Sequence, residues 1–467
     1  MTFWKRKEVN MLEGPIVPRI FELAVPLMLS NLLQVLYSAA DMIVVKHSGV
    51  MGAVGAIGTT NTVVNLLTNL FIGFSVGANV VIARNLGAKE YDRVSAAVHT
   101  SLLVGMLFGL VGGLFGFFIA PTAMVLMGDE GAILEMAVKY CRIRFLATPM
   151  MALTNFSIAT FRAKGNTTTP LGVLSISGAL NVGLNVLFVI GFGRDVDGVA
   201  WATVLSETFS ALLLLVILSK DDGPCRFSPK QLKISWPIAG EVLRIGLPAG
   251  VQSGLYNLAN MTIARSVIHM NNLLYPGGSA VLDGHSAAVS VSHFVLNCCN
   301  ALEVTLVSFT SQNVGAKNFG RLKRLFRCGF ISSFLFAASA CGLLLLFMDP
   351  LLSLYLSDPN AFAVAHTRLW IVTATYALGV LQDNGASFMR GMGRSATSTA
   401  ITLTLTCFFR VLWVYTVFAH YQTLEALYLS YPITYVLGVT AQHVAVRLTY
   451  RKLVRDNTPQ KAIVEQE

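Results

Sequence analysis

Long apolar stretches alternate with short polar segments along almost the whole chain. A membrane-spanning helix needs about 20 mostly apolar residues, because a rise of about 1.5 Å per residue then crosses roughly 30 Å of hydrocarbon. The sequence therefore predicts an all-α polytopic membrane protein. Its twelve predicted spans lie at about residues 19–45, 53–80, 96–120, 133–160, 170–192, 198–219, 243–269, 285–311, 328–348, 361–388, 396–419 and 425–447.

The second half of the chain repeats the first. RNLGAKEYDR (84–93) returns as QNVGAKNFGR (312–321), and FRAKGNTTTP (161–170) returns at the same offset as MRGMGRSATS (389–398). Such self-similarity indicates a duplicated structural unit. Six predicted spans separate corresponding residues, and an even number preserves orientation in the membrane, so the two copies are parallel repeats.

Parallel repeats of this kind place a substrate cavity between the halves near mid-membrane. We expect two six-helix bundles around a central cavity. The predicted divisions are an N-terminal bundle (1–219), a cytoplasmic linker (220–240) with three prolines, a C-terminal bundle (241–450) and a cytoplasmic tail (451–467).

Composition and charge agree with a bilayer protein. Hydrophobic residues make up 54% of the chain, charged residues 12%, and the mean hydropathy is +0.63, whereas a soluble domain carries about 25% charge. If the N-terminus is cytoplasmic, most of the 34 lysines and arginines fall in inner loops. We expect a multi-pass protein of the cell membrane, inner or plasma, with both termini in the cytoplasm. Loops facing anionic lipid explain the net charge of +10 without a nucleic-acid partner.

Known enzyme motifs do not fit the pattern. The segment from Gly73 to Gly77 matches GxSxG, but a nucleophile elbow needs a strand before it and this match lies inside a predicted span. The eight histidines form no HExxH pair, and the seven cysteines show no CxxC spacing. We therefore expect neither enzymatic activity nor a cofactor.

Glycines predict two local features. Gly87 and Gly315, in the repeated loops, are expected to take the positive φ of a tight turn. Gly105, Gly109 and Gly113 recur every four residues in the third span, which allows a neighbouring backbone to come close.

Ionisable groups inside a span are costly and indicate function. Asp41 shares one face of the first span with Gln34 and Tyr37. Counted along the helices, Asp41 lies roughly 7 to 17 Å below the outer surface, at the depth of three polar residues of the fifth and sixth spans; these are Asn181, Asn185 and Thr203. The second copy carries Asn260 where the first has Asp41, as LYSAADM (36–42) and LYNLANM (255–261) show. Ion chemistry is therefore expected in the N-terminal half.

The chain resembles, in both of its halves, the multidrug and toxic compound extrusion (MATE) transporters of the DinF-like branch. The resemblance is carried by Pro26, the Gln34, Tyr37 and Asp41 face, the paired xN(L/V)GAK loops, the Arg-x-x-Gly of both fourth loops, Asn181-x-x-x-Asn185 and GVAWAT (198–203). It implies two six-helix bundles and export of cationic or amphipathic small molecules in exchange for H⁺ or Na⁺. It also implies a coupling-ion site at Asp41, Asn181, Asn185 and Thr203, and a cavity lined by Gln34, Tyr37 and Asn155.

The chain departs from this family at two places. Asn185 stands where the family has a second acid, which leaves a dehydrated Na⁺ less well neutralised, although amide oxygens still coordinate hard cations. The glutamate that the NorM branch carries on the seventh span is also absent, since the sequence there reads Gly254-Leu-Tyr256. H⁺ and Na⁺ both remain candidates for the coupling ion.

Other charges in the spans have two interpretations each. Glu207, one turn from Thr203, is hypothesised to bind the coupling cation together with Asp41; the alternative is a structural ion pair. Arg410 is expected to pair with Glu303 or Asp383, or else to contact an anionic group of a substrate. Four cations near outer helix ends are expected to reach the interface and receive no role, namely Lys139, Arg142, Arg144 and Arg265.

These observations favour a secondary active exporter that works by alternating access. A flippase for a lipid-linked saccharide has the same duplicated architecture, but we expect it to have extra spans and several cavity cations. A membrane receptor or scaffold without transport is the alternative from another class. The sequence leaves the substrate and the oligomeric state open.

Overall fold

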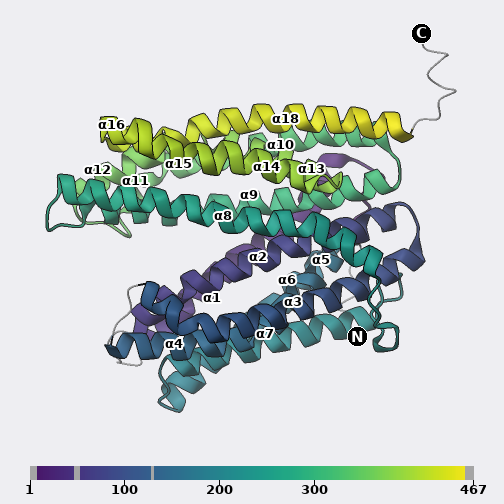
Figure 1. Cartoon of the computed structure of the whole chain (residues 1–467), viewed down its shortest axis with the longest axis horizontal. Coiled ribbons are helices and arrows are strands. Elements are labelled where there is room, and N and C mark those ends of the chain that lie inside the picture. The colour runs from purple at the N-terminus through teal and green to yellow at the C-terminus, as the bar shows by residue number, and fades with distance from the viewer. Residues whose placement is uncertain (1–7, 47–52, 128–130, 458–467) are drawn as a thin grey trace, which may run out of the picture. The chain divides into compact units, whose positions relative to one another are not determined.

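The computed structural model describes residues 8–46, 53–127 and 131–457, and within these ranges the chain is helical, without a β-strand (Figure 1). The predicted all-α class is confirmed. The helices of the first half are α1 (Ile16–Lys46), α2 (Ala53–Gly87), α3 (Tyr91–Leu126), α4 (Gly131–Leu146), α5 (Thr148–Ala163), α6 (Thr168–Asn185) and α7 (Val196–Ser219). A π-helical segment, η2 (Val186–Gly191), continues α6.

The second half follows the same plan with more interruptions. Its helices are α8 (Trp236–Leu274), α9 (Ala280–Gly315), α10 (Phe319–Leu346), α11 (Met348–Leu352), α12 (Pro359–Arg368), α13 (Tyr376–Gly391), α14 (Ser395–Thr402), α15 (Phe409–Trp413), α16 (Ala419–Tyr421), α17 (Leu424–Tyr428) and α18 (Ser430–Asn457). Three π-helical segments join some of them, namely η4 (Leu369–Thr373), η5 (Leu403–Phe408) and η6 (Val414–Phe418). A short 3₁₀ turn, η3 (Pro229–Gln231), lies between α7 and α8.

Successive pieces combine into twelve long helical segments among the described residues. α4 continues into α5, α6 into η2, α12 into α13, and α14 into α16. Eight of the twelve are long and apolar enough to cross a membrane by composition alone. The segment predicted as one span at 133–160 is divided at Ala147, because Pro149 at the start of α5 lacks the backbone donor that would continue α4.

The contacts divide the chain into two compact units. One contains Glu22–Gly254 with the short stretch before Met11, and the other contains Met11–Phe21 and the chain from Leu255 onward. The division between Gly254 and Leu255 lies inside α8, whereas the sequence placed the start of the C-terminal bundle at residue 241. The first part of α8 therefore belongs to the N-terminal unit.

Small residues set the close helix packing of the N-terminal unit. A Cβ added to Gly105 of α3 would overlap the Phe156 ring, and one added to Gly116 would overlap the Phe145 ring. A Cβ added to Gly109 would overlap the backbone around Pro149. The close approach predicted for the third span is thus present, against α4 and α5. Gly73 and Gly77 of α2 face α8 in the same way, and Ser75 between them bonds to the Ile72 carbonyl. The GxSxG match is therefore a packing element.

The two repeated loops share a turn that differs from the sequence prediction. Gly87 and Gly315 are the last helical residues of α2 and α9. The left-handed conformation falls instead on Lys89, with φ 59°, and on Lys317, with φ 52°. The expectation of a positive φ at the two glycines was wrong, because each helix includes its glycine and the left-handed residue follows two positions later.

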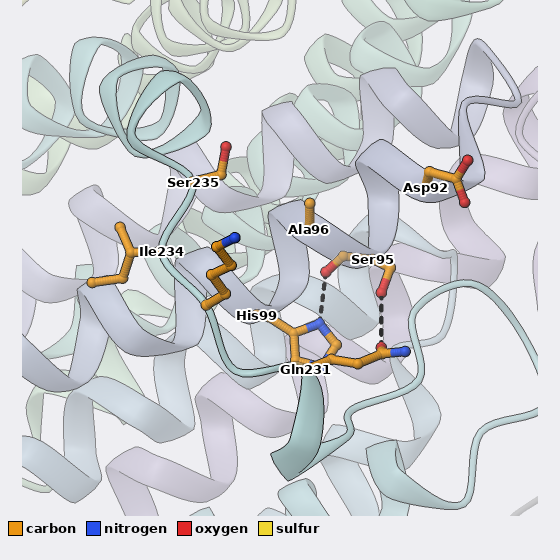
Figure 2. A pocket seen from close by; sticks show the side chains of 8 residues that line it. Asp92, Ser95, Ala96, His99, Gln231, Ile234 and Ser235 are labelled. Carbon is orange, nitrogen blue, oxygen red and sulfur yellow. Dashed lines mark hydrogen bonds between the residues drawn. The ribbon is translucent and has the colours of Figure 1, made fainter.

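Hydrogen bonds connect the linker before α8 to α3 (Figure 2). His99 Nε2 accepts the Ser228 backbone N–H at 3.0 Å, and His99 Nδ1 lies 2.7 Å from the Ser95 carbonyl oxygen. Because a backbone N–H only donates and a carbonyl only accepts, His99 is the neutral tautomer with its proton on Nδ1. Beside it is a surface pocket of about 450 Å³, lined by Asp92, Ser95, Ala96, His99, Gln231, Lys233, Ile234 and Ser235.

Candidate functional site

A chain of hydrogen bonds joins α1, α6 and α7 inside the N-terminal unit. Asn185 Nδ2 donates to Asp41 Oδ1 at 2.5 Å and to Asn181 Oδ1 at 3.2 Å. Asn181 Nδ2 donates to Thr203 Oγ1 at 3.4 Å, and the Thr203 hydroxyl donates to the Val199 carbonyl at 2.9 Å. We call Asp41, Asn181, Asn185 and Thr203 the Asp41 cluster. The four residues that the sequence placed at one depth are brought together.

The Asp41 cluster has more acceptors than donors. Asn185 is fully buried, and its Oδ1 has no hydrogen-bond partner within the described part of the chain. Both amide nitrogens of the cluster are already engaged by its own oxygens. A buried acceptor without a donor costs about 1–3 kcal/mol. A proton or a cation at this point would satisfy the surplus oxygens, so the cluster is suited to a positively charged ligand.

Tyr37 and Gly178 set the approach of α1 to α6. The Tyr37 ring occupies the space that a Cβ on Gly178 would need, and its hydroxyl donates to the Ser175 carbonyl at 3.2 Å. Asp41 lies one turn farther along α1, on the same helical face. The absence of a side chain at Gly178 thus allows α1 to pack close to α6, and this brings the Asp41 carboxylate within hydrogen-bond distance of Asn185.

A second polar contact joins the middle of α6 to the middle of α7. Ser177 Oγ donates to the Ser206 carbonyl at 2.6 Å, one turn from the bond between Asn181 and Thr203. Asn185 is the last residue of α6 before the π-helical segment η2. Such segments interrupt the regular helix ladder and occur often at functional sites.

Glu207 forms an ion pair beside the Asp41 cluster. Its Oε1 lies 3.2 Å from Nη1 of Arg144 on α4, and the two side chains are 25% and 11% exposed. The arginine neutralises Glu207 in this structure, which is the ion pair predicted from the sequence as the alternative. That Glu207 shares the coupling cation with Asp41 stays a prediction.

Arg144 is the residue that sequence reasoning missed. It was expected to reach the outer interface, but it lies inside the bundle one turn from the buried Tyr140. Both residues lie within electrostatic range of Asp41. The sequence did contain a signal for this position: Tyr140 and Arg144 are four residues apart on α4 and therefore lie on the same helix face. The three charges of Asp41, Glu207 and Arg144 leave one negative charge uncompensated.

Two of the predicted cavity residues are not members of the Asp41 cluster. Gln34 is exposed on α1. Asn155 is partly buried on α5, where its Nδ2 donates to the Met151 carbonyl of the same helix at 2.9 Å. Their role in lining a substrate cavity stays a prediction.

The charges of the C-terminal unit are arranged differently from the expectation. Arg410 is 1% exposed, its guanidinium carbon lies 4.0 Å from the centre of the Tyr431 ring, and Nη2 donates to Thr434 Oγ1 at 3.3 Å. Among the described side chains it forms no ion pair with Glu303 or Asp383 within 4.0 Å. The predicted pairing was wrong, because aromatic rings take the place of the acid.

Comparison with known proteins covers nearly the whole chain. It is 28% identical over 430 residues to the probable multidrug resistance protein YoeA of Bacillus subtilis (strain 168), covering 89% of this chain and 90% of that protein. It is 23% identical over 398 residues to the multidrug export protein MepA of Staphylococcus aureus (strain NCTC 8325 / PS 47), with coverages of 83% and 85%.

Solved structures show the same fold. A multidrug resistance MATE family transporter of the MOP superfamily in an outward-facing conformation superposes with a TM-score of 0.87 at 21% identity, over 96% of this chain and 99% of the other. A MATE transporter in a bent conformation gives a TM-score of 0.88. The MatE family model matches residues 26–187 and 248–416, one segment in each half. With both repeats matched, the chain belongs to the MatE family of multidrug and toxic compound extrusion transporters.

Proposed function

We propose that this protein is a secondary active antiporter that exports small amphipathic or cationic compounds across the cell membrane in exchange for an entering cation. The observation that carries the proposal is the Asp41 cluster, in which an intramembrane carboxylate is held by Asn185 among surplus acceptor oxygens. The multidrug resistance and export proteins named among its relatives supply the substrate class. The distribution of basic loops favours a cytoplasmic position for both termini.

The cation acts by binding one state of the transporter better than the other. Coupling requires such a difference, because a ligand with equal affinity for two states shifts nothing. In the proposed cycle the substrate binds while the cavity faces the cytoplasm. A cation then reaches Asp41 from outside, and the state in which Asp41 is neutralised releases the substrate.

The orientation of the amides favours H⁺ over Na⁺. Asn185 directs its Nδ2, not its oxygen, at Asp41 and Asn181. A dehydrated Na⁺ would need several oxygens turned inward, so the Asn185 amide would have to rotate and break its bonds to Asp41 and Asn181. A proton needs only one carboxylate oxygen. With Glu207 neutralised by Arg144, one uncompensated negative charge remains at Asp41, so we expect one monovalent cation per cycle.

Efflux from proteoliposomes tests the proposal. Purified protein is reconstituted and loaded with a cationic dye, and efflux is followed under an imposed pH gradient and, separately, under an imposed Na⁺ gradient. We expect the pH gradient to drive efflux and Asp41→Asn to abolish it. Asp92→Asn, an exposed carboxylate on α3, is the matched control and should transport normally. Full gradient-driven efflux by a folded Asp41→Asn variant would refute the assignment.

A further inference from the structure

We propose that Arg410 is the centre of a binding site in the C-terminal unit for the carboxylate of an aromatic substrate. This inference rests on the proposed function as an exporter, and it adds acidic aromatic compounds to the cationic ones. It concerns a group that the coupling mechanism at Asp41 does not use.

The guanidinium of Arg410 has unused hydrogen-bonding capacity. Within the described part of the chain Nε and Nη1 have no hydrogen-bond partner, and Nη2 makes one bond, to Thr434. The side chain is 1% exposed, so bulk solvent does not reach these donors. A buried charge without an anion is unfavourable. The free N–H groups are sufficient for both oxygens of a carboxylate, the geometry that arginine recognises best.

Aromatic rings surround the same group. The Tyr431 ring centre lies 4.0 Å from the guanidinium carbon, and the Tyr256 ring centre lies 5.9 Å away. Both tyrosines are partly exposed, unlike Arg410 itself. An aromatic ligand entering past them could stack on a ring while its acid reaches the arginine. The site thus combines one cation with apolar faces.

The acids of this unit leave Arg410 available. Asp383 is within electrostatic range of Arg410 but not within ion-pair distance. Glu303 and Asp383 both interact with a different cation, Arg390. No carboxylate among the described side chains therefore forms an ion pair with Arg410. Its guanidinium is available to bind the carboxylate of a ligand.

The duplication gives an independent reason to assign a ligand here. Tyr256 is the second-half counterpart of Tyr37, and Asn260 is the counterpart of Asp41. Arg410 corresponds to Val182, next to Asn181 in the first half. The second copy thus has an amide where the first has its acid, and a base at the position that follows the counterpart of Asn181. This difference in charge favours an anion as the ligand of the second half.

The backbone around Arg410 is also irregular. It lies on α15, a helix of one turn between the π-helical segments η5 and η6. The corresponding part of α6 has its π-helical segment directly after Asn185. Both halves therefore interrupt the helix ladder beside their buried polar groups.

Equilibrium binding to the purified protein tests the inference without any ion gradient. The probes are pyrenebutyrate, its methyl ester and pyrenemethylamine, which share one aromatic system and differ in charge, with pyrene fluorescence as the readout. We expect wild type to bind pyrenebutyrate more tightly than the ester. Arg410→Gln should weaken pyrenebutyrate binding about tenfold or more, as for a lost charge-assisted bond, and leave the ester unchanged within about twofold.

Two variants control for structure. Arg265→Gln removes an exposed arginine of α8 and should bind all three probes as wild type does. Arg410→Lys keeps the charge and should retain a measurable preference for pyrenebutyrate over the ester. An equal loss for all three probes in Arg410→Gln, or no preference for pyrenebutyrate in wild type, would overturn the inference.

Failure of the antiport proposal would give a different pattern. If Asp41→Asn transports normally but the preference for pyrenebutyrate depends on Arg410, the anion site stands and only the coupling mechanism falls. If Asp41→Asn blocks efflux and wild type shows no preference for pyrenebutyrate, the coupling proposal stands and the anion site is refuted.

Discussion

Glu207 on α7 is the ion-pair partner of Arg144 on α4, with 3.2 Å between Oε1 and Nη1. The pair lies beside Asp41, whose own contact is with the amide of Asn185. In the antiport that we propose, neutralisation of Glu207 by Arg144 leaves Asp41 as the acid that binds the entering cation.

Removing only one member of the pair should damage coupling more than removing both. In Glu207→Gln the Arg144 guanidinium loses its partner, and the nearest remaining carboxylate is Asp41. We expect Arg144 to compete with the coupling cation, so pH-driven efflux should fall by at least about tenfold. The pair is only partly buried, so its loss should also destabilise the protein by less than the loss of about 3 kcal/mol typical of a buried pair.

The double variant Arg144→Met/Glu207→Gln is the decisive comparison. Without the guanidinium, Asp41 is free again and efflux should recover to a large part of the wild-type rate. Proteoliposome efflux and thermal unfolding of the purified variants measure both effects. Losses in the double variant equal to the sum of the single losses would show that Arg144 and Glu207 act independently.

Two glycines of α6 should respond in opposite ways to alanine. In Gly178→Ala the new methyl group overlaps the Tyr37 ring, so α1 must shift away from α6. We expect a loss of stability of about 1–3 kcal/mol and a slower coupled efflux, because Asp41 moves with α1. Gly183→Ala is the matched control, since nothing lies within 4 Å of a Cβ there. It should be neutral or slightly stabilising, and equal damage from both variants would contradict this view of the contact.

The His99 bond to the linker should be visible in amide hydrogen exchange. His99→Ala removes the acceptor of the Ser228 N–H and the stacking contact with Phe227. We expect exchange at Ser228 and its neighbours to accelerate by at least about tenfold, consistent with the loss of one buried hydrogen bond and its packing. Ser95→Ala removes only a long 3.4 Å bond to Gln231 and keeps the carbonyl that His99 uses. Its exchange should resemble that of the wild type.

Lys164 should give the stability of the N-terminal unit a dependence on alkaline pH. Burial opposes the charge of Lys164, but its hydrogen bonds to Asp221, at 2.7 Å, and Glu8, at 3.0 Å, outweigh this and raise its pKa above the ordinary value of 10.5. Because the folded state holds this proton more tightly, the stabilisation is complete below pH 10.5 and is lost as the pH rises through the folded-state pKa.

Thermal unfolding of wild type and Lys164→Gln from about pH 9 to about pH 12 checks this sign. We expect a difference of about 2 kcal/mol at the lower end, typical of hydrogen bonds between charged groups, which shrinks above pH 10.5. Lys230→Gln, an exposed linker lysine, should show no such trend. A difference that grows with pH would contradict the assigned contacts.

The parts of the fold that follow from local pattern could be predicted from the sequence. Apolar length located the spans, and the duplicated RNLGAK and QNVGAK segments were sufficient to identify the repeat. The polar face of Asp41 and its depth were enough to bring it to Asn181, Asn185 and Thr203, because rise per residue fixes depth along a helix.

Depth along a helix does not determine how the helix is rotated about its axis, or where it is interrupted. Arg144 could have reached the outer surface from its position in the sequence, and only the orientation of α4 before the break at Ala147 turns it towards Glu207. For the same reason the acid expected beside Arg410 was replaced by the Tyr431 ring. The left-handed residue at Lys89 depends on where α2 ends, which the spacing of glycines did not reveal.

The glycine contact between α2 and α8 places the first part of α8 in the N-terminal unit. A Cβ on Gly77 or Gly246 would overlap the facing backbone, so the first part of α8 is seated firmly on α2. The peptide chain crosses between the units at Gly254–Leu255, within a continuous helix. This covalent connection between the units is therefore helical backbone with its own hydrogen bonds. The linker from Lys220 to Gly240 lies within the N-terminal unit and does not form this connection.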